Sequence, residues 1–152
     1  MEKRITLCNY DRLFLKLSYI WLTDPEIRAL TDTPEITEEE QECWFNSLEQ
    51  RSDYKVWGVR CNDMPIGVCG IKNIEKNKGE YFGYIGEKSY WGGTGRKMME
   101  VLEKTAIDLG LKILTLKVLK WNTRAICLYR AMKYNQISAD NRFIYMSKNI
   151  NL

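Results

Sequence analysis

The most restrictive feature of the sequence is a glycine-rich junction between a predicted strand and a predicted helix. Residues 81–85 are aromatic and β-branched, as in strands. From Met98 onward, apolar residues recur at the i, i+3, i+4 spacing of one helix face, so the helix is predicted to begin at about Arg96. The glycines before it are Gly92, Gly93 and Gly95. Free amides and the positive end of a helix dipole bind anions, so the junction predicts a phosphate site.

Two common phosphate-binding loops do not fit this junction. The Walker loop requires Gly-Lys followed by Ser or Thr, but Gly95 is followed by Arg96, Lys97 and Met98. The dinucleotide pattern G-x-G-x-x-G also fails, because Met98 stands where its last glycine is required. The sequence therefore argues against a nucleoside triphosphatase and against a dinucleotide-binding protein.

Residues 90–95, Tyr-Trp-Gly-Gly-Thr-Gly, resemble the [Q/R]-x-x-G-x-[G/A] signature of the Gcn5-related N-acetyltransferases (GNAT), with Tyr90 in place of Gln or Arg. Downstream, Asn122, Ala125 and Tyr129 resemble the family's N-x-x-A-x-x-x-Y-x-x-x-G-F block, with Lys133 and Tyr134 replacing the final Gly-Phe. Because the two motifs occur in the family's order, the resemblance rests on more than one glycine loop.

The resemblance implies that the chain binds acetyl-CoA and transfers its acetyl group to a primary amine by direct attack in a ternary complex. The glycine loop would hold the diphosphate, one strand would pair with the pantetheine arm, and the Asn122 side chain would bind that arm. Asn122 is equally well explained as a helix N-cap. The implied cofactor-binding residues are Gly83, Tyr84, Ile85, Tyr90, Trp91, Gly92, Gly93, Thr94, Gly95, Arg96 and Asn122.

Acetyl transfer to an amine needs a route for two protons. An alkylammonium has a pKa of about 10.4, so a base, a water relay or a substrate amine of lowered pKa is required. The resemblance implies Tyr129 as the general acid near the thioester sulfur, although this tyrosine also fits an apolar helix stripe. Glu80 is the predicted base and Glu87 a weaker candidate; both also fit as surface charges. The chain has no histidine, which excludes Ser-His-Asp and Cys-His chemistry.

The remaining sequence predicts an α/β (α+β) fold with the element order of the GNAT family. Its mixed, mostly antiparallel, twisted sheet would have six to seven strands and about four flanking helices, and would be splayed between the fourth and fifth strands. Strands are predicted at residues 4–8, 54–61, 65–74, 81–85, 112–118 and 143–147. Helices are predicted at 11–30, with an interruption at 23–25, at 37–50 after a Thr37 capping box, at about 96–109 and after Asn122.

Bulk properties agree with one domain spanning residues 1–152. The net charge of +3 is too small to argue for nucleic acid, and without a long apolar run or a leader we expect a cytoplasmic protein with no membrane partner. Five cysteines without a C-x-x-C pair predict no metal site. The sequence does not decide the oligomeric state and leaves a homodimer open.

The acceptor is expected to be a small-molecule amine. Trp21, Pro25 and the acidic helix after Ile36 resemble the amino-terminal half of bacterial acetyltransferases that modify nucleotide-linked amino sugars. Ribosomal-protein N-terminal and spermidine acetyltransferases share this organisation, so peptide and polyamine acceptors stay open. Aromatic and cationic candidates for a sugar nucleotide are Trp21, Trp44, Trp57 and Lys72. The alternative of another class is a non-catalytic acyl-CoA-binding module.

Overall fold

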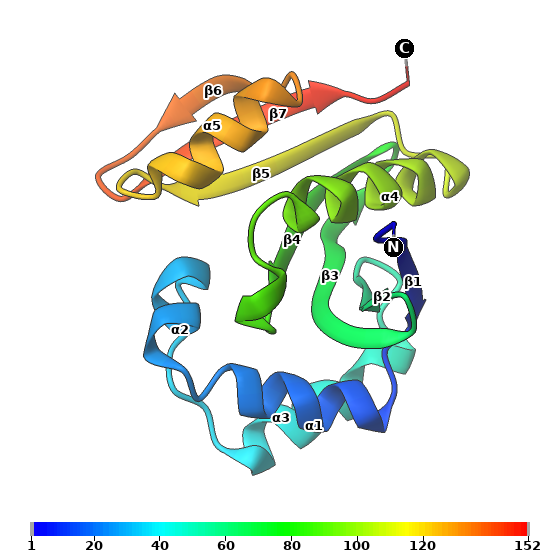
Figure 1. Ribbon diagram of the computed structural model, residues 1–152. Coiled ribbons are helices and arrows are strands. Elements are labelled where there is room, and N and C mark those ends of the chain that lie inside the picture. The colour runs from blue at the N-terminus through cyan, green and yellow to red at the C-terminus, as the bar shows by residue number, and fades with distance from the viewer. Residues whose placement is uncertain (1, 152) are drawn as a thin grey trace.

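The computed structural model describes residues 2–151 and shows a seven-stranded sheet in the order β1-β2-β3-β4-β5-β7-β6 (Figure 1). The strands are β1 (Ile5–Asn9), β2 (Lys55–Cys61), β3 (Met64–Glu75), β4 (Lys78–Ile85), β5 (Ile113–Leu119), β6 (Asn135–Ala139) and β7 (Phe143–Asn149). The helices are α1 (Arg12–Trp21), α2 (Pro25–Thr31), α3 (Glu38–Ser47), α4 (Thr94–Asp108) and α5 (Thr123–Ala131), with 3-10 turns η1 (Leu48–Gln50) and η2 (Lys88–Tyr90). The predicted fold class is confirmed.

The sheet opens in its middle, as the sequence predicts. Neighbouring strands are antiparallel except β4 and β5, which run parallel and pair only from Lys78 with Ile113 to Glu80 with Thr115. Beyond Glu80 the two strands separate, while β4 stays paired with β3 as far as Ile85. We call the region between residues 81–85 of β4 and 116–119 of β5 the splay.

Local signals fix the helices of the amino-terminal half. The Asp11 carboxylate caps α1 by accepting from the Phe14 amide, and Asp24 caps α2, whose first residue is Pro25. The predicted capping box is present in α3, because Thr37 and Glu40 each accept a hydrogen bond from the other's amide at 3.1 Å. These N-caps fix where the three helices begin, at Arg12, Pro25 and Glu38.

Helices cover both faces of the sheet, and each face has its own core (Figure 1). The larger cluster joins α4 and α5 to the sheet and includes Met99, Leu102 and Leu114, all almost fully buried. The smaller cluster, under α1 and α2, consists of Phe14, Trp21, Ile27 and Val68. Since Val68 and Cys69 belong to different clusters, successive residues of β3 serve opposite faces.

Strand β6 is the element that the sequence pattern does not locate. All five of its residues are exposed, so it lacks the alternation of apolar and polar residues that marks a half-buried strand. It forms an edge hairpin with β7, and Arg142 in the turn of that hairpin forms an ion pair with Asp32 at the end of α2. The α4 helix begins at Thr94, two residues earlier than predicted.

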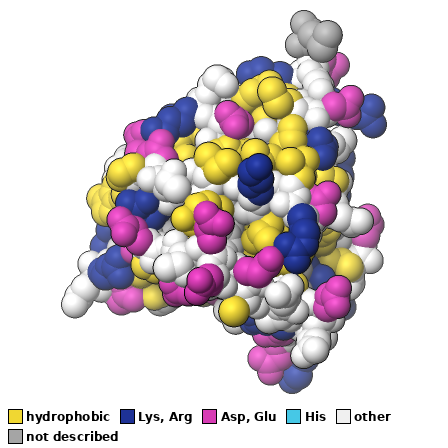
Figure 2. All heavy atoms as spheres, turned by 90° about the horizontal axis from the view of Figure 1, so that it is seen from below, with side chains coloured by type: hydrophobic (Ala, Val, Ile, Leu, Met, Phe, Trp, Pro, Cys, Tyr) yellow, Lys and Arg dark blue, Asp and Glu magenta, His cyan; other side chains and the backbone are white. Residues whose placement is uncertain are grey.

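The face formed by α1–α3 carries acidic and basic side chains in alternation, without a continuous patch of either sign (Figure 2). Across residues 2–151, none of the helices combines the length and the apolar character that a membrane crossing requires.

Phe14 anchors α1 on the sheet. Its side chain is fully buried, and its ring occupies the space that a side chain at Gly58 would fill. We expect Phe14→Ala to lower the free energy of unfolding by about 3–5 kcal/mol in urea denaturation, because it leaves a cavity. Leu13→Ala is the matched control: Leu13 is 46% exposed on the same helix, so its loss should stay within about 0.5 kcal/mol. Equal effects of the two substitutions would contradict this packing.

Candidate active site

The glycine loop presents a row of unpaired amides at the start of α4. No acceptor among residues 2–151 is paired with the N–H groups of residues 92–96, and α4 has no side-chain N-cap. Gly92 and Gly93 have φ values of +95° and +87°, a left-handed conformation that favours glycine. We call the N–H groups of residues 92–96 the amide cradle. With the dipole of a 15-residue helix behind it, this cradle suits a diphosphate.

The space around the cradle also fits a bound group. A side chain at Gly93 would meet no protein atom within 4 Å, and one at Gly95 would meet only Leu128, at 3.9 Å. Thr94, the first residue of α4, is 2% exposed and its hydroxyl has no hydrogen-bond partner in the described chain. Free space beside the glycines and hydrogen-bond donors without partners are the features that the diphosphate of coenzyme A requires.

Tyr90 and Trp91 differ from the rest of the predicted cofactor loop. Their amides donate to Glu87 and Lys88 within the η2 turn, at 2.9 and 3.0 Å, so these two N–H groups are already used. The Trp91 indole donates to the carbonyl of Ile85 at 2.8 Å. Trp91 therefore fastens the loop to the end of β4, and the amides left for an anion are those that follow it.

Arg124 is a cation beside the cradle that the sequence motifs do not identify. Its Nη2 lies 3.7 Å from the position that a Cβ of Gly92 would take. Within residues 2–151 it forms no ion pair, whereas Arg96 lies 3.5 Å from Glu100 and Lys97 donates to the Lys3 carbonyl. Arg124 thus brings a positive charge near the loop in which Tyr90 replaces the usual Gln or Arg. The sequence feature that could have identified Arg124 is its position within the N-x-x-A block, at the start of α5.

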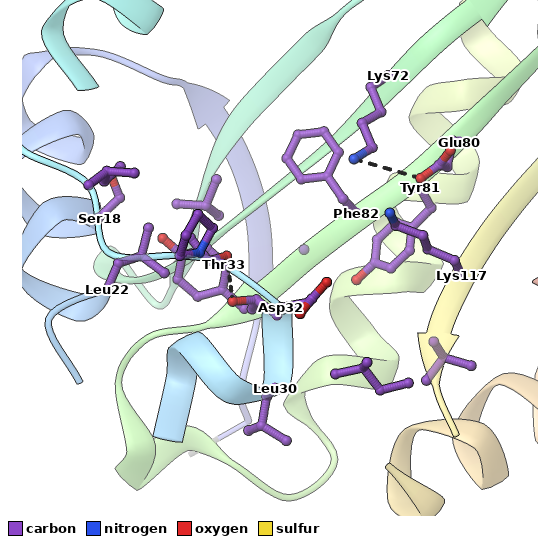
Figure 3. Close-up of a pocket in the computed structure, with 18 of the residues that line it drawn as sticks. Ser18, Leu22, Leu30, Asp32, Thr33, Lys72, Glu80, Tyr81, Phe82 and Lys117 are labelled. Atoms are coloured by element: carbon purple, nitrogen blue, oxygen red, sulfur yellow. Dashed lines mark hydrogen bonds and ion pairs between the residues drawn. The ribbon is translucent and has the colours of Figure 1, made fainter. Parts of the chain in front are cut away.

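A cavity of about 600 Å³ extends from the helices α1–α3 through the splay to α5. That volume is typical of small-molecule sites. Ser18 and Leu22 lie at one end, and Lys72, Glu80, Tyr81 and Lys117 lie together at the other (Figure 3). Five residues of β4, from Glu80 to Tyr84, line it, which brings the strand predicted to pair with pantetheine into the same cavity as Tyr129 and Asn122.

Tyr129 and Asn122 both line the cavity. The Tyr129 hydroxyl has no hydrogen-bond partner among the described residues, and burial raises the pKa of Tyr129 to about 12. It therefore stays protonated well above neutral pH, as a proton donor must. The Asn122 side chain caps α5 by accepting from the Ala125 amide at 3.3 Å, so its structural role is present while it also lines the cavity.

The structure separates the two predicted bases. Glu80 lines the cavity at the last paired position before the splay. It accepts from Asn73 at 3.2 Å, and its carboxylate lies 3.7 Å from Lys72 (Figure 3). Glu87 does not line the cavity: its carboxylate accepts from the Trp21 indole at 2.9 Å, which ties α1 to the loop after β4. Of the two predicted bases, only Glu80 therefore borders the cavity.

Of the four side chains predicted to bind an acceptor, two line the cavity and two do not. Trp44 and Lys72 line the cavity, whereas Trp21 is buried beneath Gly86 and Trp57 packs against the larger core. The sequence did not identify two further aromatic residues of the cavity, Tyr54 and Phe82. The ring centroid of Tyr54 lies 6.1 Å from that of Trp44, and the centroid of Phe82 lies 5.3 Å from that of Tyr54, so the three rings form one aromatic wall along the cavity.

Carboxylates that line the cavity already have partners. Asp32 forms an ion pair with Arg142 at 2.6 Å, Glu40 belongs to the capping box, and Glu80 lies near Lys72. Lys117 differs: it lies 4.8 Å above the Phe143 ring, with no carboxylate partner in the described chain. Lys117 is therefore a lining cation without an acidic partner among the described residues, whereas the Glu40 carboxylate accepts from a backbone amide.

Comparison with known proteins gives consistent matches. The model of the acetyltransferase (GNAT) family matches residues 19–134. The acetyltransferase PseH of Campylobacter jejuni is 30% identical over 134 residues, which cover 87% of this chain and 83% of that protein. The chain is thus similar to a named acetyltransferase over most of both lengths.

Solved structures share the fold. The N-acetyltransferase PseH of Campylobacter jejuni in complex with acetyl coenzyme A has a TM-score of 0.76 and 24% identity, covering 96% of this chain and 99% of that chain. The spermidine N-acetyltransferase of Vibrio cholerae in complex with CoA and spermine has a TM-score of 0.87 and 17% identity, covering 95% of both. Acetyl-CoA is the acetyl donor of the matched family, so the predicted enzyme class and cofactor are confirmed. The chain belongs to the acetyltransferase (GNAT) family.

Proposed function

We propose that this acetyltransferase moves an acetyl group from acetyl-CoA to the primary amine of a nucleotide-linked amino sugar. The observation that carries the acceptor class is the charge of the cavity: its carboxylates have partners, while Lys117 has none. An anionic acceptor gains from such a site.

The chain's own groups supply the binding of the donor. The amide cradle and Arg124 hold the diphosphate, and the backbone of residues 83–85 pairs with the pantetheine arm in the splay. Of these three, Ile85 already accepts from Trp91 through its carbonyl, so Gly83 and Tyr84 contribute more of that pairing. The donor supplies an acetyl group on a thioester, which an amine can displace.

Two side chains then transfer the protons of the reaction. Glu80, directly or through a water, takes a proton from the acceptor ammonium, so that a neutral amine forms the new C–N bond. As the C–S bond breaks, the Tyr129 hydroxyl donates its proton to the leaving sulfur. Burial favours this role because it keeps the hydroxyl protonated, with a pKa of about 12.

The acceptor's nucleotide would use the other wall of the cavity. Trp44, Tyr54 and Phe82 offer ring faces for a base, a contact worth roughly 1–3 kcal/mol per stacked base. Lys72 and Lys117 are the nearby cations for the diphosphate. A polyamine would instead need several carboxylates without cationic neighbours, and Asp32 and Glu80 lie beside Arg142 and Lys72.

An acceptor panel tests the proposal. Thiol release from acetyl-CoA is measured with UDP- and dTDP-linked amino sugars, spermidine and peptides with free N-termini. The proposal expects a nucleotide-linked amino sugar to give the highest kcat/KM, and Lys117→Gln to lower that value with little change for spermidine or the peptides. A higher kcat/KM for spermidine or a peptide would contradict the proposed acceptor class. Binding of coenzyme A without turnover on any amine would favour a non-catalytic module.

Tyr129→Phe tests the proton donor. We expect kcat to fall by about 10²-fold, since general acid catalysis contributes roughly 10²–10⁴, while the Kd for acetyl-CoA stays near that of the wild type. Because the pKa of Tyr129 is raised to about 12, its ionisation should not limit the wild-type rate below about pH 11. An unchanged kcat would remove Tyr129 from the reaction.

Arg124→Gln tests the cation beside the cradle. We expect the KM for acetyl-CoA to rise about tenfold at low salt, because a hydrogen bond to a charged group contributes roughly 1.5–3 kcal/mol, and the difference to shrink at high salt. Arg130→Gln is the control, since Arg130 is also exposed on α5 but is not placed at the loop. Equal KM values for the two variants would argue against a role for Arg124.

A further inference from the structure

Tyr81 is a second tyrosine at the splay, beside Tyr129. It is the first residue of β4 beyond the last pair with β5, and only 6% of its surface is exposed. Its ring meets the Tyr129 ring edge to face, with centroids 6.4 Å apart, and both residues line the cavity. Figure 3 shows Tyr81 in the same end of the cavity as Glu80 and Lys117.

The Tyr81 side chain lies along its own strand and brings its hydroxyl to Gly83. A Cβ at Gly83 would lie 2.8 Å from that oxygen, closer than a carbon can stand, so glycine is what leaves room for it. Gly83 lies in the segment proposed to pair with the pantetheine arm. The hydroxyl is therefore fixed next to the backbone that would guide the thioester.

The Tyr81 hydroxyl has no hydrogen-bond partner in the described part of the chain. Neither Tyr81 nor Tyr129 has a hydrogen-bonded hydroxyl within residues 2–151, whereas those of Tyr10, Tyr134 and Tyr145 bind Ser18, Glu103 and Asp140. Among the described residues, the fully buried side-chain oxygens without a partner are those of Tyr84 and Thr94, so the Tyr81 oxygen borders the open space of the cavity instead. A bound group that accepts a hydrogen bond can therefore reach it, and burial of the residue, which raises the pKa of Tyr81, keeps the proton available.

Acetyl transfer develops negative charge at two atoms. When the amine nitrogen forms its bond to the acyl carbon, charge moves to the acyl oxygen; when the C–S bond breaks, it moves to sulfur, which takes a proton. We infer that Tyr81 donates a hydrogen bond to the acyl oxygen while Tyr129 serves the sulfur. This assignment rests on the proposed function, because it takes acetyl-CoA to lie in the splay. Tyr81 keeps its proton throughout, so the transfer balances without it.

The stretching frequency of the bound acetyl carbonyl tests this directly, without an acceptor. Infrared difference spectra are recorded for acetyl-CoA carrying ¹³C at the carbonyl, bound to the full-length protein. A hydrogen bond to the acyl oxygen lowers the frequency. We expect Tyr81→Phe to raise it and Tyr129→Phe to leave it unchanged. A frequency unaffected by Tyr81→Phe, or moved by Tyr129→Phe, would overturn the assignment.

Kinetics and controls separate this role from packing. With the best acceptor, Tyr81→Phe should lower kcat by about 10²-fold, with the KM for acetyl-CoA and the Tm near the wild-type values. Tyr145→Phe removes a hydroxyl outside the cavity and should change neither the frequency nor kcat. Gly83→Ala should also raise the frequency, because its methyl group displaces the Tyr81 hydroxyl. If acetyl-CoA does not bind the wild-type protein, the proposed function itself fails, and the assignment with it.

Discussion

The early end of the pairing between β4 and β5 is the constraint on which the site depends. Three residue pairs hold these parallel strands together, and the two strands separate beyond Glu80. Because β4 remains paired with β3, its other edge is left with unused backbone groups facing the splay. The cavity, Tyr81, Tyr129 and Glu80 all meet at this opening. A fully paired sheet would leave neither the cavity nor a place for an acyl group.

Both faces of the sheet contribute to the opening. On one face, α4 starts directly after the glycine loop and points its amide cradle outward, while Trp91 holds that loop to the end of β4. On the other, Phe14 and Trp21 fix α1 beneath the sheet, and the contact between Trp21 and Glu87 reaches the same loop. The anion site and the floor of the cavity are therefore joined through one short segment after β4, which fixes their separation.

The sequence alone was enough to predict the features that depend on local backbone conformation. Gly92 and Gly93 do adopt the left-handed conformation for which glycine is needed, and the capping box at Thr37 forms as predicted. It was not enough to predict contacts between residues that are distant in the chain. Glu87 lies 66 positions from Trp21, its partner, so its role in packing could not be read from its neighbours. Arg124 and Lys117 were missed for the same reason, and β6 because its exposed residues carry no apolar alternation.

The central claim is that the amides of residues 92–96 hold the diphosphate of coenzyme A. Backbone amide NMR spectra of the protein, recorded with coenzyme A and with pantetheine, test it most directly because pantetheine lacks the diphosphate. The account predicts that coenzyme A shifts the amide signals of Gly92, Gly93 and Gly95, that pantetheine does not, and that both shift Gly83. Loop signals that stay in place while coenzyme A shifts Gly83 would contradict it.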